Sequence, residues 1–567
     1  MNSQTSGNES FDTYALTAPT YDQVADEYQQ IHEQLGADDS ADGCAAAVQQ
    51  WEMVRRRLSE WASLTEIRFH QDTRDEQFKA AKQQCDELKP RLTELEVAMK
   101  RRLIEPPCCD AVADRWGSHV LELWKCDIAS FDPVIQEDLV QESKLVSDYT
   151  ELLASAKFDY RGESHTLSEL RKYAEDPQRD VRHETAQLRS DWFGDHREQL
   201  DGLYAELVAL RDGMARKMDY DNYVGLGYRL MQRVDYDQSD VEAFRAQVRE
   251  EVVPLCAELK KRQSAQLGLD PLMAWDEALH DLRGNPAPQG DHDWMIDQAA
   301  TMFAQVGGGL DEFFAAMRRR SLLDLKSRPG KAGGGFCDGL PEFGMPFIFA
   351  NFNGTKGDVE VFTHEMGHAY QNYSSRHQPL CDYRWPTSEA CEIHSMGLEF
   401  LTWPQMELFF GEAAERFRTI HLSGSIVFIP YGVAVDHFQH LVYERPDATR
   451  DERSEMWLEM ERIYMPWRQW GDLANEASGR FWQGQLHIYV HPFYYIDYTL
   501  ALTCALQLWT LAREDWQEAM QRYVQLCRRG GEAPFQQLVA SAGLRSPFAD
   551  GCLTDVVDAA RRALEIA

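Results

Sequence analysis

The sequence predicts a mainly α-helical protein with one small β-sheet. Apolar residues recur at intervals of three and four through most of the chain, which is the pattern of helices with one buried face. One such stripe consists of Trp51, Val54, Leu58, Trp61 and Leu64. Helix breakers gather instead between residues 327 and 353, where three successive glycines precede an apolar run. That run, residues 345–352, predicts a strand, so we expect the sheet beside this segment.

The remaining elements follow from the same signals. We expect residues 1–20 to form a loose or extended leader and residues 21–103 to be helical, up to the break at Pro106-Pro107. A short strand and turn at 158–163 should precede a helix capped by Thr166. Further helices are expected at 139–156, 180–233, 294–317 and from 387 to the end, with a long connection rich in glycine and proline at 267–293.

Size and charge narrow the class of protein. The chain has 567 residues, of which 44% are hydrophobic and 27% charged, which is ordinary for a folded protein with more than one structural unit. The formal net charge of −35 argues against nucleic acid or an anionic membrane as a partner. The acidic surface is therefore expected to serve solubility.

The cysteine spacing and the amino-terminal residues lead us to expect a cytoplasmic protein. The first residues carry neither the basic nor the apolar segment of a signal peptide, and no apolar run reaches about 18 residues, so no membrane span is expected. The 12 cysteines include no Cys-x-x-Cys pair. We expect reduced, mostly buried thiols and a cytoplasmic protein.

The segment VFTHEMGHAY (361–370) carries the first chemical motif. On a helix, residues four apart share a face, so His364 and His368 aim two imidazoles at one point, as a zinc ion requires. Glu365 lies beside that point and could deprotonate the attacking water. Apolar residues on the opposite side give the helix a core face. The alternative is a pair of surface histidines on an ordinary helix.

A catalytic zinc site needs a third protein ligand. The helix expected after residue 387 offers Glu389, Glu392 and Glu399. Glu392 and Glu399 are seven apart and share a face, and two acids on an otherwise apolar helix are costly to bury unless they are paired. Spacing alone leaves Glu389 and Glu392 as rival ligands.

Three segments resemble the thimet oligopeptidase and oligoendopeptidase F family of zinc peptidases, nearest the bacterial Pz-peptidase type. They are GKAGGGF (330–336), PFIFANFNGTKGDVEVFTHEMGHAYQ (346–371) and EACEIHSMGLEF (389–400). In that family the third ligand opens a Glu-x-x-Ser-x-x-x-Glu segment, which here runs from Glu392 to Glu399. The resemblance thus implies Glu392 as the ligand and Glu399 as a carboxylate behind the ligands. His394 stands where the wider family often has proline.

The family also binds the substrate carbonyl with a downstream cluster of histidine and tyrosine. Residues 487–498, HIYVHPFYYIDY, resemble that cluster and imply His487, Tyr494 and Tyr498, or Tyr495 if the match is shifted by one. A phenol donor at a developing oxyanion can supply roughly 3 kcal/mol. Some of these tyrosines must only pack in the core. A second metal pair of His487 and His491 is disfavoured, because Pro492 ends the helix and no third ligand is evident.

The resemblance further implies a two-lobed helical ellipsoid around a deep channel that admits unfolded oligopeptides. It implies that strand 345–352 is an edge strand that holds an extended peptide, although the apolar run fits a core strand equally well. We expect an N-terminal helical region at 1–180 and a catalytic domain at 181–567, with one zinc ion per chain. The sequence indicates no oligomeric state.

The expected function is therefore zinc-dependent cleavage of internal bonds in short unfolded peptides. His364, His368 and Glu392 would bind zinc, Glu365 would be the general base, and His487 with the tyrosines would stabilise the oxyanion. Two alternatives are a catalytically inactive peptide-binding protein of the same fold and a helical scaffold whose HEMGH is accidental. Retention of Glu365 argues against the first, and the second acidic helix argues against the other.

Overall fold

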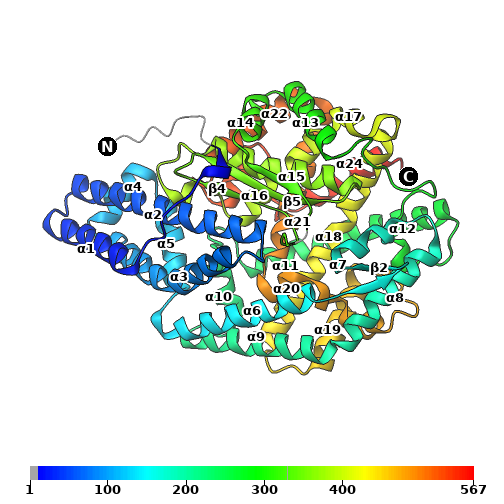
Figure 1. Cartoon of the computed structure of the whole chain (residues 1–567), viewed down its shortest axis with the longest axis horizontal. Coiled ribbons are helices and arrows are strands. Elements are labelled where there is room, and N and C mark those ends of the chain that lie inside the picture. The colour runs from blue at the N-terminus through cyan, green and yellow to red at the C-terminus, as the bar shows by residue number, and fades with distance from the viewer. Residues whose placement is uncertain (1–9, 329, 567) are drawn as a thin grey trace.

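The protein is built mainly from helices, as the sequence predicts. The computed structural model of the chain describes residues 10–328 and 330–566. In Figure 1 the first five helices form a lobe on one side of a larger body of packed helices. The small sheet lies in this larger body, beside the helix that contains HEMGH (Figure 1).

The N-terminal lobe has an apolar core that also includes Leu380 and Tyr383 of the larger body. Trp51 and Trp124 meet edge to face there, with ring centroids 5.5 Å apart. One helix runs through Pro90 without ending and stops at Leu103, before the expected break at Pro106-Pro107. The lobe consists of α1 (Tyr21–Ala37), α2 (Ala41–Gln71), α3 (Glu76–Leu103), α4 (Cys108–Trp116) and α5 (His119–Ala129).

The segment before α1 is anchored to the larger body. The side chain of Phe11 is 1% exposed, and its ring centroid lies 4.4 Å from that of Phe347. The backbone N–H of Phe11 donates to the carbonyl of Arg320 at 2.8 Å. The expectation of a loose or extended leader is therefore wrong at Phe11–Thr13, which forms a short 3-10 helix with Phe11 buried, and residues 1–9 of that leader lie outside the described part of the chain.

The middle of the chain adds helices around one short hairpin. Strands β1 (Phe158–Tyr160) and β2 (Glu163–His165) pair antiparallel, and Thr166 then caps the next helix, as expected. The helices are α6 (Gln136–Ala154), α7 (Leu167–Leu170), α8 (Arg179–Asp195), α9 (Arg197–Lys217), α10 (Tyr223–Leu230), α11 (Gln238–Gln247), α12 (Val253–Leu267), α13 (His292–Val306) and α14 (Leu310–Arg319).

The main sheet has the strand order β3-β5-β4. β5 (Met345–Phe352) pairs parallel with β3 (Leu323–Lys326) and antiparallel with β4 (Phe336–Leu340). The family-based expectation that 345–352 is an edge strand is wrong, because this strand is the central one. Its first six residues are buried, as the apolar run requires. The edge next to the HEMGH helix is β4.

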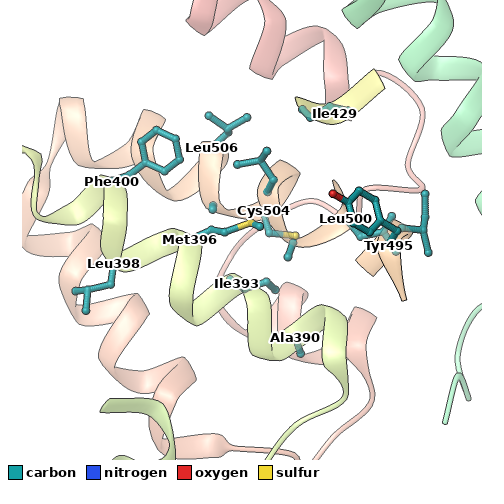
Figure 2. Packing of buried hydrophobic residues seen from close by; sticks show 14 of the residues in the cluster. Ala390, Ile393, Met396, Leu398, Phe400, Ile429, Tyr495, Leu500, Cys504 and Leu506 are labelled. Atoms are coloured by element: carbon teal, nitrogen blue, oxygen red, sulfur yellow. The ribbon is translucent and has the colours of Figure 1, made fainter. Parts of the chain in front are cut away.

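The C-terminal part of the chain packs further helices around the helix that contains HEMGH. α15 (Lys356–Ser374) packs on α16 (Ser388–Leu401), and α16 packs on α21 (Tyr495–Glu514). Figure 2 shows Met396 and Phe400 of α16 directed toward α21. The others are α17 (Glu407–Phe410), α18 (Ala414–Glu444), α19 (Arg450–Tyr464), α20 (Leu486–Val490), α22 (Trp516–Arg529), α23 (Phe535–Ser541) and α24 (Cys552–Leu564).

The expectation that all cysteines are thiols is wrong for two of them. Cys44 and Cys108 form a disulfide between α2 and α4, with their Cα atoms 5.4 Å apart and both side chains buried. The other described cysteines are free. A structural disulfide is more typical of oxidising compartments, so the cytoplasmic location stays a prediction.

Among the described residues, one helical stretch is long and apolar enough to cross a membrane by composition alone. It spans Glu407–Glu444, and 61% of its most apolar window is buried inside the protein. Side chains along it, such as Val433 and Phe438, are part of the main core. Its apolar composition is accounted for by this central position in the fold.

Candidate metal centre and active site

Helix α15 presents its two histidines on one face. Its first turn is held by Asp358, whose carboxylate accepts the backbone N–H groups of Asn353 and Gly354 at 2.9 and 2.7 Å. The ring centroids of His364 and His368 lie 5.0 Å apart, as expected for residues one turn apart. The opposite face is buried in the core through Phe362, Met366, Ala369 and Tyr370.

Gly367, inside the motif, lets the second acidic helix approach α15. A Cβ atom at this position would lie 2.4 Å from the carbonyl oxygen of His394 on α16, so a larger residue would push the two helices apart. This close contact brings Glu392 to the histidines. Its Oε2 lies 3.2 Å from Nε2 of His364 and 3.3 Å from Nε2 of His368.

Within the described residues, His364, His368 and Glu392 form the one cluster of metal-ligating side chains, with donor atoms within 4.8 Å of one another. The set comprises two imidazole nitrogens and a carboxylate oxygen, which suits zinc. Three buried or half-buried polar atoms converge on one point. These residues therefore fit a metal ion of the kind that the sequence predicts.

Glu399 fixes the orientation of the first histidine. Its two carboxylate oxygens accept hydrogen bonds from Nδ1 of His364 at 2.7 Å and Nε2 of His421 at 2.8 Å. Trp403 donates its indole N–H to Nδ1 of His421 at 3.2 Å, which assigns the proton of His421 to Nε2. With Nδ1 of His364 donating, Nε2 of His364 keeps its lone pair for a metal.

The second oxygen of Glu392 is also held. The hydroxyl of Tyr494 donates to Oε1 at 2.8 Å, and the hydroxyl of Ser395 donates to Oε2 at 2.8 Å. Tyr494 thus contacts a candidate metal ligand directly. The structure places it as a support of Glu392, a role that the sequence pattern did not indicate.

Electrostatics keep the acidic groups of the centre ionised. Burial would raise the pKa of Glu392, but the neighbouring His368 and His364 hold it well below its usual value. Burial likewise opposes ionisation of Glu399, yet its hydrogen bonds to His364 and His421 lower its pKa to about 2. Both carboxylates therefore carry negative charge at neutral pH, as ligation and orientation require.

Glu365 differs from these two acids. It is 7% exposed, and burial raises its pKa above the usual value. Its Oε2 atom is buried and has no hydrogen-bond partner. A Cβ built on Gly335 would lie 3.6 Å from Oε1 of Glu365, so the glycine-rich loop before β4 passes close to this carboxylate. The arrangement leaves an unpaired carboxylate oxygen beside the candidate metal site.

His487 and Tyr498 also lie together near the centre. Gln485 donates to Nδ1 of His487 at 3.0 Å, and Nε2 of His487 lies 3.4 Å from the hydroxyl of Tyr498. Burial lowers the pKa of His487 to about 4, so this imidazole is neutral at pH 7. The ring of Tyr495 also contacts His487, with ring centroids 5.2 Å apart, and packs against Phe428 and Tyr431.

The rings of His487 and His491 lie farther apart than those of His364 and His368. Their ring centroids lie 6.4 Å apart, and the cluster of metal-ligating groups found in the described part of the chain includes neither. α20 ends at Val490, as Pro492 predicts.

A strained turn sets the position of the tyrosines. Phe493 has a φ of 65°, an unfavourable conformation for a bulky residue. Its backbone N–H donates to Oε1 of Gln439 at 3.2 Å, and its carbonyl accepts from Nη2 of Arg233 at 2.6 Å. Arg233 also pairs with Asp497 at 2.8 Å. Gly227 leaves room for the phenyl ring, since a Cβ there would lie 2.6 Å from it.

Comparisons with known proteins give the family of the chain and structures of similar fold. Residues 11–131 match the "Peptidase M3 N-terminal domain" and residues 309–557 match "Peptidase family M3". A solved structure of Pz peptidase A with an inhibitor is 41% identical, covering 98% of this chain and 99% of that one, with a TM-score of 0.96.

The chain belongs to peptidase family M3. An oligoendopeptidase F structure is 43% identical over 99% of both chains, with a TM-score of 0.96. An oligoendopeptidase F from Bacillus anthracis str. Ames is 38% identical over 98% of both chains, with a TM-score of 0.91. The search of curated proteins found no match. The family resemblance drawn from the three sequence segments is confirmed.

In this M3 peptidase the residues named from sequence lie close together, but others are added by the fold. His421 completes the pair of donors to Glu399, Gly335 lies beside Glu365 and Arg233 anchors the turn before the tyrosines. The glycine run at 333–335 was a visible signal, although its position beside Glu365 was not. His421 stands in α18 and Arg233 in the connection between α10 and α11, neither with a distinguishing motif.

Proposed function

We propose that this M3 peptidase is a zinc-dependent endopeptidase that hydrolyses internal bonds of short, unfolded oligopeptides. One observation carries the proposal: two imidazole nitrogens and the Glu392 carboxylate converge within 4.8 Å, directly beside Glu365. His364, His368 and Glu392 would hold the zinc ion. The bound ion would supply Lewis acidity, which polarises a carbonyl and eases deprotonation of water.

Glu365 would act as the general base. Its unpaired Oε2 is free to accept a hydrogen bond from the attacking water. Burial favours its protonated form, so after taking the proton it can pass it to the leaving amine. The backbone of Gly335 passes beside this carboxylate, since a Cβ there would lie 3.6 Å from Oε1 of Glu365.

Tyr498 and His487 would stabilise charge on the oxygen of the cleaved carbonyl. Both can donate a hydrogen bond, and a donor aimed at a developing oxyanion is worth about 3 kcal/mol. Tyr494 is already engaged with Glu392, so we assign it to holding that ligand. This division leaves Tyr498 as the phenol available to substrate.

The free edge of β4 would bind the substrate backbone. β4 pairs with β5 on one side only and begins next to Gly335. An extended peptide could add to such an edge as a further strand, with recognition by main-chain hydrogen bonds and little dependence on sequence. This mode requires an unfolded segment, which supports oligopeptides as the substrate class.

Hydrolysis of an internally quenched peptide with blocked termini tests the proposal. We expect internal cleavage, identified by mass spectrometry of the products, loss of activity with a chelator and recovery with zinc. Glu365→Gln should keep its metal and lose about a thousandfold in turnover. A folded globular protein should remain intact in the same assay. Tight peptide binding without any cleavage would instead support the inactive peptide-binding alternative.

A further inference from the structure

An apolar pocket beside the candidate metal centre has no assigned role. It has a volume of about 530 Å³ and lies between α16, α18 and α21, within the range of about 300–1,000 Å³ that is common for ligand pockets. Glu399, His487 and Tyr498 line one part of it. The pocket therefore opens at the residues proposed to orient the metal ligand and to bind the substrate carbonyl.

The walls of this pocket are suited to an apolar side chain. Met396 and Phe400 come from α16, Phe428 from α18 and Leu502 from α21, and Figure 2 shows Met396 and Phe400 on the side of α16 that faces α21. Its margin carries the charged residues Glu175, Lys356, Glu360 and Glu399, of which the last three have partners. Glu399 binds two histidines, and Lys356 pairs with Glu360 at 2.9 Å.

The spacing of residues on α16 places the pocket next to the proposed metal ligand Glu392. Met396 lies one turn, and Phe400 two turns, beyond Glu392 on α16, so the three side chains share one face. A side chain in the pocket would therefore belong to a peptide residue next to the bond that is cut.

Gly424 lines the pocket from α18. It lies on α18 between Ile420 and Phe428, one turn from each, and is exposed although this helix runs through the core. A Cβ built on Gly424 meets no atom within 4 Å. Glycine in a helix interior costs roughly 1 kcal/mol relative to alanine, so this position favours open space over helix stability.

Gly424 lines both the apolar pocket and a second cavity. A larger cavity of about 820 Å³ lies on the other side, against α12 and the connection after it, and shares Ala278, His280, Ile420 and Gly424 with the apolar pocket. A side chain at position 424 would narrow the passage between them.

We propose that the apolar pocket is a specificity site for an aromatic or large aliphatic side chain adjacent to the cleaved bond, and that Gly424 is the residue that admits it. The proposal rests on the peptidase function proposed above. A fit of this kind discriminates by roughly 10–200-fold between side chains that differ by a few carbon atoms.

A peptide series with single substitutions tests it. Blocked, internally quenched peptides carry alanine at every position or one phenylalanine at each position in turn. We expect the wild-type kcat/KM to rise at least about tenfold when phenylalanine occupies one position next to the cleaved bond. Gly424→Leu should remove this preference and Gly424→Ala should reduce it.

Gly202→Leu is the matched control, because Gly202 also lies in a helix and a Cβ there meets no atom within 4 Å, but it is remote from the pocket. It should leave the preference unchanged. Thermal unfolding verifies that each variant is folded, and Gly424→Ala, which favours the helix, remains informative if Gly424→Leu is unstable.

A binding measurement separates this proposal from the proposed function. The same peptides are titrated against Glu365→Gln, with and without Gly424→Leu, by fluorescence anisotropy. A preference for phenylalanine that Gly424→Leu abolishes supports the pocket even if no peptide is cut. Unchanged selectivity in the Gly424→Leu variants, by cleavage or by binding, overturns the pocket while leaving the peptidase function intact. Peptides that are neither cut nor bound contradict both.

Discussion

Two carboxylates one turn apart on α16 behave in opposite ways. Glu389 and Glu392 are equally buried, at 1% and 3% exposure. Burial and the charge of Asp497 raise the pKa of Glu389 to about 8, whereas His368 and His364 hold that of Glu392 well below its usual value. Burial alone therefore does not decide the state of a carboxylate, because its partners do. Although the two residues are neighbours on the helix surface, Glu392 belongs to the candidate metal cluster and Glu389 to a structural network.

The structural network near Glu389 is centred on Arg233, which binds both Phe493 and Asp497. Its Nη2 atom binds the carbonyl of Phe493 at 2.6 Å and Asp497 at 2.8 Å, and both charged side chains are fully buried. Oε2 of Glu389 has no hydrogen-bond partner, which fits a protonated acid beside a buried ion pair. Glu389 thus has an electrostatic role in the fold and is absent from the cluster that could hold a metal.

The largest expected effect comes from breaking this ion pair. Arg233→Met leaves the Asp497 carboxylate buried without its partner, which costs about 3–5 kcal/mol of unfolding free energy. Denaturant unfolding near pH 7.5 measures this loss. Arg233→Met combined with Asp497→Asn should recover part of the stability, since no buried charge remains. Equal instability of the double variant would show that the charge pair is not the cause.

The second effect is a pH dependence that Glu389 should impose. Its pKa is raised from 4.5 to about 8 in the folded protein, so its stabilising contribution is complete below about pH 4.5 and is lost as the pH rises through 8. Asp497, Asp235 and Arg233 are its charged neighbours. The loss is at most about 1.4 kcal/mol per pH unit.

Glu389→Gln removes this titration. Thermal unfolding between pH 6 and 8.5 should show the wild type losing stability relative to the variant as the pH rises. Parallel profiles for the two proteins would mean that Glu389 is ionised throughout, and the contrast with Glu392 would disappear.

The smallest expected effect is a loss of metal affinity when the hydrogen bonds of Glu399 are weakened. Glu399→Gln weakens the hydrogen bonds to His364 and His421, and loss of such support lowers metal affinity by about 10–100-fold, or about 1.4–2.7 kcal/mol. Competition with a chelating dye measures the affinity. Glu407→Gln is the control, because Glu407 is an exposed carboxylate that pairs with Arg418 and is absent from the candidate metal cluster. If both variants bind the metal with equal affinity, Glu399 does not support the candidate metal site.

The local parts of this account were predictable from sequence. The positions of His364, His368 and Glu392 depend on helical spacing and one helix contact, and the breaker-rich segment correctly located the sheet. The choice between Glu389 and Glu392 needed the family resemblance, since both acids could share a helix face with a metal. Spacing carries no information about the partners that each acid meets across the fold.

What the sequence did not reveal depends on contacts between distant segments. His421 reaches Glu399 from another helix, Arg233 holds Phe493 across 260 positions, and Cys44 meets Cys108 across 64. The edge assignment of strand 345–352 failed for the same reason, because the pairing of β3 and β4 on both its sides is a tertiary property. Each of these residues looks ordinary in its local sequence.

Metal content is the most direct test of the central claim, that Glu392 and not Glu389 completes the site with His364 and His368. Glu392→Ala and Glu389→Gln are purified in parallel, equilibrated with zinc, dialysed and analysed by mass spectrometry for metal, with thermal unfolding as the check that both are folded. We expect about one zinc per chain in Glu389→Gln and in the wild type, and far less in Glu392→Ala, because removal of one of three protein ligands leaves an incomplete site. One zinc retained by a folded Glu392→Ala, together with its loss from Glu389→Gln, would contradict the account.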